Sequence, residues 1–282
     1  MSTEQGSPVP FTTSDGTTLF RRVYEPPATV VGELLLGHGI GENSSRYIQA
    51  ARAFAAAGWR TTTWDLRGHG RSGGARGYVR EFRRFQLDLT EQVLDLQRLG
   101  RRVAVVSHSL GGLIAFGAAA AGLIKPDALV LSAPALEANI ATWKRIAAPI
   151  LSRIVPMLRI PTGIGADTAP GEQLENLDPE APGYLYAVTT RLGDEGFRAQ
   201  KAARAVVAAG GTFPVPTLVT QGEHDTLVRP EWTKPLASLG NVEYLTLKGF
   251  NHHPFATRAY QVAVDEMLER IGRGEPGSAL TT

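Results

Sequence analysis

The sequence predicts an α/β domain with a mostly parallel central sheet, helices on both faces and an inserted helical cap. Short apolar runs alternate with stretches of helical periodicity along most of the chain, a pattern typical of a parallel sheet covered on both sides. An interval of about eighty residues interrupts this alternation and predicts an insertion. The 282 residues suffice for one large domain of this kind, although two small domains would also fit.

The chain opens with a predicted β-hairpin at Phe11–Tyr24, where Asp15-Gly16 suits a tight turn between two β-favouring runs. We expect this hairpin to be antiparallel and to lie at the edge of the sheet. Apolar runs then predict strands at Glu33–Leu36, Arg60–Trp64, Val103–Val106, Leu129–Leu131, Thr217–Thr220 and Val242–Leu247.

Helices are predicted where apolar residues recur at three- and four-residue steps. These stretches are Tyr47–Ala57, Phe85–Leu99, Leu110–Leu123, Pro230–Leu239 and Pro254–Ile271. Proline at the start of the last two suits a first helical position.

The long interval predicts that residues 136–212 form a helical cap plus the helix that returns to the core, which comprises 1–135 and 213–282. Within the cap, an apolar stripe predicts an amphipathic helix that Pro149 and Pro156 interrupt or kink. The stripe comprises Trp143, Ile146, Ala147, Ile150, Leu151, Ile154 and Leu158. Two interpretations stay open: the stripe packs the cap onto the core, or part of it lines an acyl pocket or touches lipid. The small, polar tail 274–282 is expected to fray.

Composition excludes several classes of protein. The 29 basic and 27 acidic side chains nearly cancel, which argues against a nucleic-acid partner. The chain has no cysteine, so disulfides, thiolate metal sites and cysteine nucleophiles are excluded. No signal peptide and no apolar run long enough to span a membrane is apparent. We therefore expect a cytoplasmic protein, with peripheral membrane contact through the cap left open.

Ser109 is the candidate nucleophile. The segment Arg102–Phe116 reads as a β-branched run, a cluster of small residues and an apolar helix. A serine on such a strand-to-helix turn is held in a strained conformation that needs small residues two positions away, here Ser107 and Gly111. The usual pattern is G-x-S-x-G, and Ser107 stands where its first glycine is expected.

The candidate acid and base follow later in the chain. Asp225 lies in the loop after the predicted strand Thr217–Thr220, with Glu223 as the alternative. His252 is favoured over His253 as the base, because Pro254 would rigidify the segment just beyond His253. The order Ser109, Asp225, His252 is that of a serine nucleophile, acid and base built on one sheet.

Four segments together resemble the α/β-hydrolase superfamily and, within it, the monoacylglycerol lipase and lysophospholipase group. Two are the nucleophile and acid/base segments. The others are His38-Gly-Ile-Gly-Glu-Asn-Ser-Ser-Arg-Tyr47, similar to H-G-x-G-E-x-S-x-R-Y, and Asp65-Leu-Arg-Gly-His-Gly-Arg-Ser-Gly-Gly74, similar to D-x-x-G-H-G-x-S-x-G. The resemblance implies an oxyanion hole formed by the backbone N–H groups of Ile40 and Leu110. It also implies that the second motif is a structural buttress.

These observations predict a serine hydrolase that cleaves carboxylic esters through an acyl-enzyme, on monoacylglycerols or lysophospholipid-type esters. No cofactor and no metal is predicted, since the oxyanion donors and the triad suffice for this chemistry. Within the same fold, a short-chain carboxylesterase, a thioesterase and a proline-type aminopeptidase are alternatives. A non-catalytic ligand-binding module is the alternative outside enzymes. The sequence does not indicate an oligomeric state.

Overall fold

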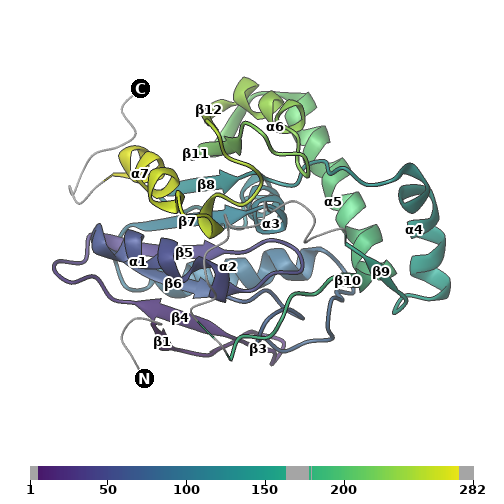
Figure 1. The fold of residues 1–282 in the computed structure, drawn as a ribbon, viewed down its shortest axis with the longest axis horizontal. Coiled ribbons are helices and arrows are strands. Elements are labelled where there is room, and N and C mark those ends of the chain that lie inside the picture. Colours follow the sequence, from purple (N-terminus) through teal and green to yellow (C-terminus); the bar gives the residue numbers. More distant parts are fainter. Residues whose placement is uncertain (1–5, 163–177, 179, 273–282) are drawn as a thin grey trace.

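The computed structural model describes residues 6–162, 178 and 180–272. Its centre is an eight-stranded sheet in the order β1-β4-β6-β5-β7-β8-β11-β12 (Figure 1). The pairings β1–β4 and β4–β6 are antiparallel and the others are parallel. The strands are β1 (Ser7–Pro8), β4 (Arg21–Tyr24), β5 (Gly32–Gly37), β6 (Trp59–Trp64), β7 (Val103–His108), β8 (Ala128–Ser132), β11 (Thr212–Gly222) and β12 (Gly240–Leu247). The predicted mostly parallel sheet is confirmed.

Helices cover both faces of this sheet, as predicted. They are α1 (Ile48–Ala56), α2 (Arg83–Gln97), α3 (Leu110–Ala120), α4 (Thr142–Ile154), α5 (Thr190–Ala209), α6 (Pro230–Thr233) and α7 (Tyr260–Ile271), with the 3₁₀ helices η2 (Ser44–Tyr47), η3 (Lys234–Ser238) and η4 (Pro254–Ala256). The side chains of β5 show why both faces need cover. Leu34 and Leu36 pack with α1 and α7, whereas Leu35 packs with α2 and α3. Alternate residues of a strand point to opposite faces, so a continuous apolar run serves two cores.

The predicted N-terminal hairpin forms, but its position differs from the expectation. β2 (Phe11–Thr12) and β3 (Thr18–Leu19) pair antiparallel around Gly16 as a separate two-stranded sheet. The edge of the main sheet is instead β1, which pairs with β4. The hairpin strands are too short to extend that edge, and the Arg67 guanidinium ties the turn at Asp15 to the core.

Two predicted helices are shorter than the periodicity suggested. The helix expected over Pro230–Leu239 ends at Thr233 and continues as the 3₁₀ helix η3, because Pro235 has no backbone N–H to continue the α-helical hydrogen bonds. The helix expected over Pro254–Ile271 is divided into η4 and α7, with Thr257 extended between them. Phe255 in η4 is buried against Tyr47 and His108, which holds this first turn beneath the sheet's carboxyl edge.

The segment between β8 and β11 holds α4, the strands β9 (Arg159–Pro161) and β10 (Ala187–Thr189), and α5. β9 and β10 pair antiparallel, which the sequence did not predict. In Figure 1, α4 and α5 lie side by side at the right of the sheet, and α5 also contacts α3. Residues 163–177 and 179 of the predicted cap, and the tail 274–282, lie outside the described residues.

The apolar stripe of α4 faces outward. Pro149 lies inside the helix, and the buried residues of α4 are Ala148 and Ser152. Trp143, Ile146 and Ile154 are 59%, 69% and 71% exposed. Of the two interpretations left open, packing of the stripe onto the core is wrong for these three residues and for Ile150 and Leu158, which are also exposed. The helix turns its small side chains inward instead. Among the described helices, none is long and apolar enough to cross a bilayer.

Candidate active site

Ser109 lies on a sharp turn between β7 and α3. Its backbone has φ 51° and ψ −112°, a left-handed conformation that is rare for a residue with a side chain. The turn requires Gly111, because a Cβ there would lie 2.7 Å from the carbonyl oxygen of His38. Strained backbone of this kind is found where a nucleophile must project above a sheet. The predicted strand-to-helix turn is therefore present in the structure.

Ser107 occupies the place of the first glycine of the motif, and the neighbouring strand accommodates it. Gly37 on β5 pairs with Ser107 on β7. A Cβ on Gly37 would lie 3.1 Å from the Ser107 hydroxyl oxygen. The missing side chain on β5 thus leaves the space that the Ser107 hydroxyl fills.

His252 joins the serine to a carboxylate from another loop. Its Nε2 lies 3.1 Å from Ser109 Oγ, and its Nδ1 lies 2.7 Å from Asp225 Oδ2. All three side chains are almost fully buried. The arrangement matches the geometry in which an imidazole takes the proton of a serine while a carboxylate fixes its tautomer.

Asp225 is held in place by the loop that carries it. Its Oδ1 accepts the backbone N–H groups of Leu227 and Val228 at 2.9 and 2.8 Å, and its Oδ2 also accepts the side-chain amide of Gln221 at 2.8 Å. Glu223, the alternative acid, is half-exposed and accepts the N–H of Gly249 at 3.0 Å. The structure thus brings Asp225, rather than Glu223, to His252.

Ile40 and Leu110 both line the pocket beside Ser109. A Cβ on Gly39 would lie 3.0 Å from Ser109 Cβ, so the loop after β5 passes close to the serine. Leu110 is the first residue of α3, and the N–H groups in the first turn of a helix have no intrahelical acceptor. These positions fit two backbone donors beside an ester carbonyl at Ser109.

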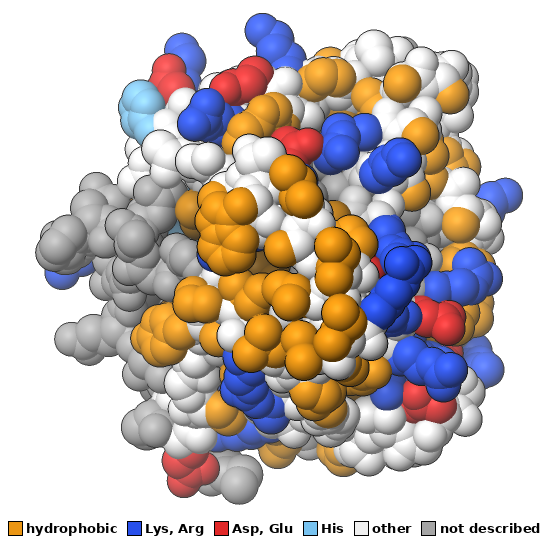
Figure 2. All heavy atoms as spheres, turned by 90° about the vertical axis from the view of Figure 1, so that its right-hand side faces the viewer, with side chains coloured by type: hydrophobic (Ala, Val, Ile, Leu, Met, Phe, Trp, Pro, Cys, Tyr) orange, Lys and Arg blue, Asp and Glu red, His pale blue; other side chains and the backbone are white. Residues whose placement is uncertain are grey.

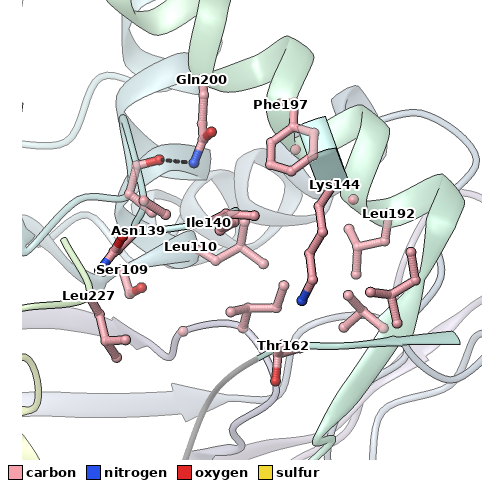
Figure 3. A pocket seen from close by; sticks show the side chains of 18 of the residues that line it. Ser109, Leu110, Asn139, Ile140, Lys144, Thr162, Leu192, Phe197, Gln200 and Leu227 are labelled. Carbon is pink, nitrogen blue, oxygen red and sulfur yellow. Dashed lines mark hydrogen bonds between the residues drawn. The ribbon is translucent and has the colours of Figure 1, made fainter. Parts of the chain in front are cut away.

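A pocket of about 260 Å³ opens from Ser109 toward α4 and α5 (Figure 3). Its lining is mainly apolar and includes Leu113, Ile140, Ala148, Ile160, Val188, Leu192, Phe197, Leu227 and Val228. Two polar side chains in the lining are held by main-chain carbonyls. Gln200 donates to Ala135 at 3.0 Å and Lys144 donates to Pro161 at 3.1 Å. The pocket therefore offers a largely apolar surface next to the serine.

The family model described as "Serine aminopeptidase, S33" matches residues 28–256, most of the chain. The chain belongs to this family of α/β-hydrolases. A monoglyceride lipase of Homo sapiens is 30% identical to the hydrolase over 83% of this chain and 78% of that protein. A monoacylglycerol lipase of Mycolicibacterium smegmatis is 29% identical over 91% of this chain and 93% of that protein. The crystal structure of a Paleococcus ferrophilus monoacylglycerol lipase has a TM-score of 0.74 at 25% identity, covering 90% of this chain and 98% of that one.

Glu42 connects the loop that carries Gly39 and Ile40 to the loop that carries His252 and His253, a role that sequence reasoning missed. Its Oε2 accepts the N–H of Gly39 at 3.0 Å and the hydroxyl of Tyr47 at 2.7 Å, and its Oε1 pairs with Arg46 and lies 3.2 Å from His253 Nδ1. Burial alone would raise the pKa of Glu42, but the charge of Arg46 and the contact with His253 hold the pKa well below its ordinary value. The signal was the glutamate of the H-G-x-G-E motif, two residues after the predicted oxyanion residue Ile40.

His253, the alternative base, points to Glu42. Burial lowers the pKa of His253 although Glu42 opposes the shift, and burial together with the neighbouring His252 lowers the pKa of His108. His38 braces its loop: its Nε2 accepts the N–H of Leu66 at 2.9 Å and its Nδ1 lies 2.7 Å from the carbonyl oxygen of Gly39. Of these histidines, His252 is the one whose ring nitrogen lies within hydrogen-bond distance of the Ser109 hydroxyl.

The segment Asp65–Gly74, which matches the D-x-x-G-H-G-x-S-x-G pattern, contacts the chain just after the H-G-x-G-E segment. Asp65 is buried and accepts the backbone N–H groups of Ser44 and Arg71, each at 2.7 Å. Gly70 is required in this turn, because a Cβ there would overlap the Asp65 carboxylate. These contacts fit the expected structural buttress, since they tie the Asp65–Gly74 turn to Ser44, which follows the loop that carries Ile40.

Proposed function

We propose that this hydrolase cleaves carboxylic esters through a covalent acyl-enzyme. His252 takes the proton of Ser109, and Ser109 attacks the ester carbonyl. The N–H groups of Ile40 and Leu110 stabilise the oxyanion, while Asp225 orients the imidazole and stabilises its charged form. His252 then gives the proton to the leaving alcohol. In the second half of the reaction His252 takes a proton from water, the water attacks the acyl-enzyme carbonyl, and His252 returns the proton to Ser109 as the acid leaves. The observation that carries the proposal is the hydrogen-bonded chain from Asp225 to Ser109, at the mouth of an apolar pocket.

The proposed substrates are monoacylglycerols or lysophospholipid-type esters. An apolar pocket next to the serine favours an acyl chain over a charged group, because burial of each methylene stabilises the complex by about 0.8 kcal/mol. The names of the relatives described above support the same substrate class. In this proposal residues 136–212 act as the cap that walls the pocket, since α4, β9, β10 and α5 all contribute lining residues. The cytoplasmic location stays a prediction from the sequence.

The test is the rate of hydrolysis of a monoacylglycerol series from short to long chains, with Ser109→Ala as the blank. We expect a rate that depends on Ser109 and is highest at medium or long chains. Activity confined to the shortest chains would move the assignment to a short-chain carboxylesterase. Activity only on acyl thioesters or on prolyl peptides would favour a thioesterase or an aminopeptidase.

We also propose that the outer face of α4 touches a lipid surface. Trp143, Ile146, Ile150 and Ile154 are more than half exposed there, beside exposed Met157, Leu158 and Tyr186. Figure 2 shows a continuous apolar area on this face, flanked by Lys and Arg side chains. Apolar residues bordered by basic ones are typical of surfaces that bind anionic membranes.

Vesicle co-sedimentation tests this contact, with phosphatidylcholine vesicles that contain phosphatidylserine. We expect Ile150→Asp to lower the bound fraction several-fold. Val262→Asp is the matched control, because Val262 on α7 is 54% exposed and Ile150 is 58% exposed. Equal binding by the two variants would refute the contact. A monomeric Ile150→Asp variant beside a dimeric parent would instead show that a second copy covers the face.

A further inference from the structure

Three buried histidines form a cluster directly beside Ser109. His108, His252 and His253 are 0%, 4% and 9% exposed. Their ring centroids lie 4.7 Å apart for His108 and His252, 5.4 Å for His108 and His253, and 4.8 Å for His252 and His253. One ring nitrogen from each lies within 4.8 Å of one from each of the others. The proposed acyl transfer uses only one of these three rings.

Each of the three rings has its Nδ1 next to an oxygen. His252 Nδ1 lies 2.7 Å from Asp225, and His253 Nδ1 lies 3.2 Å from Glu42. His108 Nδ1 lies 3.2 Å from the hydroxyl of Ser132. Histidines that bind metals in proteins commonly donate one ring N–H to an oxygen acceptor, which fixes the ring and leaves the other nitrogen as the ligand.

The nitrogen of His108 that would serve as a ligand has no partner. His108 Nε2 is buried and makes no hydrogen bond within the part of the chain that the structure describes. A buried polar atom without a partner costs about 1–3 kcal/mol. A bound cation would remove that cost. The unpaired nitrogen therefore supports a ligand at this cluster, in addition to the short distances between the three rings.

We propose that His108, His252 and His253 bind a divalent cation of the Zn²⁺ or Cu²⁺ type, and that the bound cation inhibits the enzyme. Imidazole nitrogens suit these ions, and the chain has no cysteine to compete for them. The carboxylates of Asp225 and Glu42 stand directly behind two of the ligands and favour positive charge. The cation reaches the cluster through the substrate pocket, which His252 and His253 line.

Binding requires a modest movement of the rings. Zn–N bonds of about 2.0–2.1 Å place tetrahedral ligand nitrogens about 3.4 Å apart, so the rings must approach by up to about 1.4 Å. We expect His253 to move most, because it is the most exposed of the three rings. His252 Nε2 then binds the cation and is no longer available to take the proton of Ser109. The cation is thus an inhibitor. It differs from a catalytic metal or cofactor, neither of which the sequence predicts.

The test uses Cu²⁺ as the probe and reads binding without turnover, so the result does not depend on the proposed ester hydrolysis. We expect the electron paramagnetic resonance spectrum of the protein with one equivalent of Cu²⁺ to show coupling to three nitrogens. His253→Gln should reduce the coupling to two nitrogens and weaken Cu²⁺ binding at least tenfold. His224→Gln is the control, because His224 has a side chain that is 62% exposed and lies outside the cluster.

His108→Gln provides a second variant if His253→Gln does not fold, and it should also leave two nitrogens. Zn²⁺ inhibition should weaken at least tenfold in the same variants, each compared with its own rate in a chelator. Coupling to fewer than three nitrogens in the parent protein would overturn the proposal. Loss of the copper signal in His224→Gln would do the same, since it would assign the ion to the surface.

Discussion

Two glycines on α5 set the depth of the pocket. Gly193 and Gly196 both line it, and a Cβ at either position would have no heavy atom within 4 Å. The space beside them is therefore available either to an acyl chain or to a larger side chain. We predict that Gly196→Leu shortens the acyl chain that the enzyme accepts and leaves the shortest substrates unaffected.

The magnitude follows from the volume that the new side chain takes. Leucine adds four carbon atoms and displaces about three methylenes of an acyl chain, each contributing about 0.8 kcal/mol when buried. The loss of about 2.4 kcal/mol lowers kcat/KM for long chains about 50-fold. Folding is not expected to suffer, because glycine inside a helix is less favourable than leucine by about 0.5–1 kcal/mol.

The assay compares kcat/KM for short and long monoacylglycerols in Gly196→Leu and in Ala202→Leu. Ala202 is the matched control, since it is exposed on the same helix and does not line the pocket. The ratio of long-chain to short-chain kcat/KM should fall only in Gly196→Leu. An unchanged ratio would show that the acyl chain lies elsewhere. An equal loss for every chain length would indicate a disturbed serine site rather than a shortened pocket.

Other predictions concern single residues. His252→Ala should lower kcat by several orders of magnitude and His253→Ala far less, because His253 contacts Glu42 rather than the serine; steady-state kinetics with the reverse order would reassign the base. Asp225→Asn should lower kcat by about 10⁴-fold with the fold intact by circular dichroism, because the imidazole loses its orienting acceptor; a mild effect would reject this role. Burial lowers the pKa of His69 from 6.5 to about 3. The contribution of neutral His69 to the free energy of unfolding is complete above pH 6.5. It is lost as the pH falls from 6.5 toward 3, because the unfolded chain binds the proton there and the folded chain does not. Urea unfolding should therefore show a loss of unfolding free energy between pH 7 and 5.5, and this loss should be smaller by about 1.2 kcal/mol in His69→Gln.

Much of this fold was predictable because its signals are local. Strands such as Leu129–Leu131 are buried on both faces, so they read as continuous apolar runs. The turn at Ser109 needs small residues at fixed positions, and it was recognised from them. The same holds for Asp225 and His252, since parallel strands deliver their following loops to one edge of the sheet. The closeness of Ser109, Asp225 and His252 could therefore be predicted from their places after successive strands, without information about long-range contacts.

What could not be predicted depends on contacts between distant segments. Glu42 stands out only when the loops that carry Gly39 and His253 meet around it. The substitution of serine at position 107 looked like a weakness of the motif, because the sequence does not show that Gly37 faces it across the sheet. Whether a substitution within a motif is compatible with the fold depends on the residue that faces it on the neighbouring strand.

The apolar stripe of α4 shows that the surroundings of a whole helix are also not predictable from its own sequence. Periodicity establishes that one face of a helix is apolar, but it does not establish what covers that face. In this enzyme Ala148 and Ser152 face inward, where small side chains leave room for a pocket against α5, and the large residues face outward. Covering the pocket with Trp143, Ile146 and Ile154 would fill the volume that an acyl chain needs. The orientation of α4 therefore keeps the pocket open and leaves the large apolar side chains on the outer face of the helix.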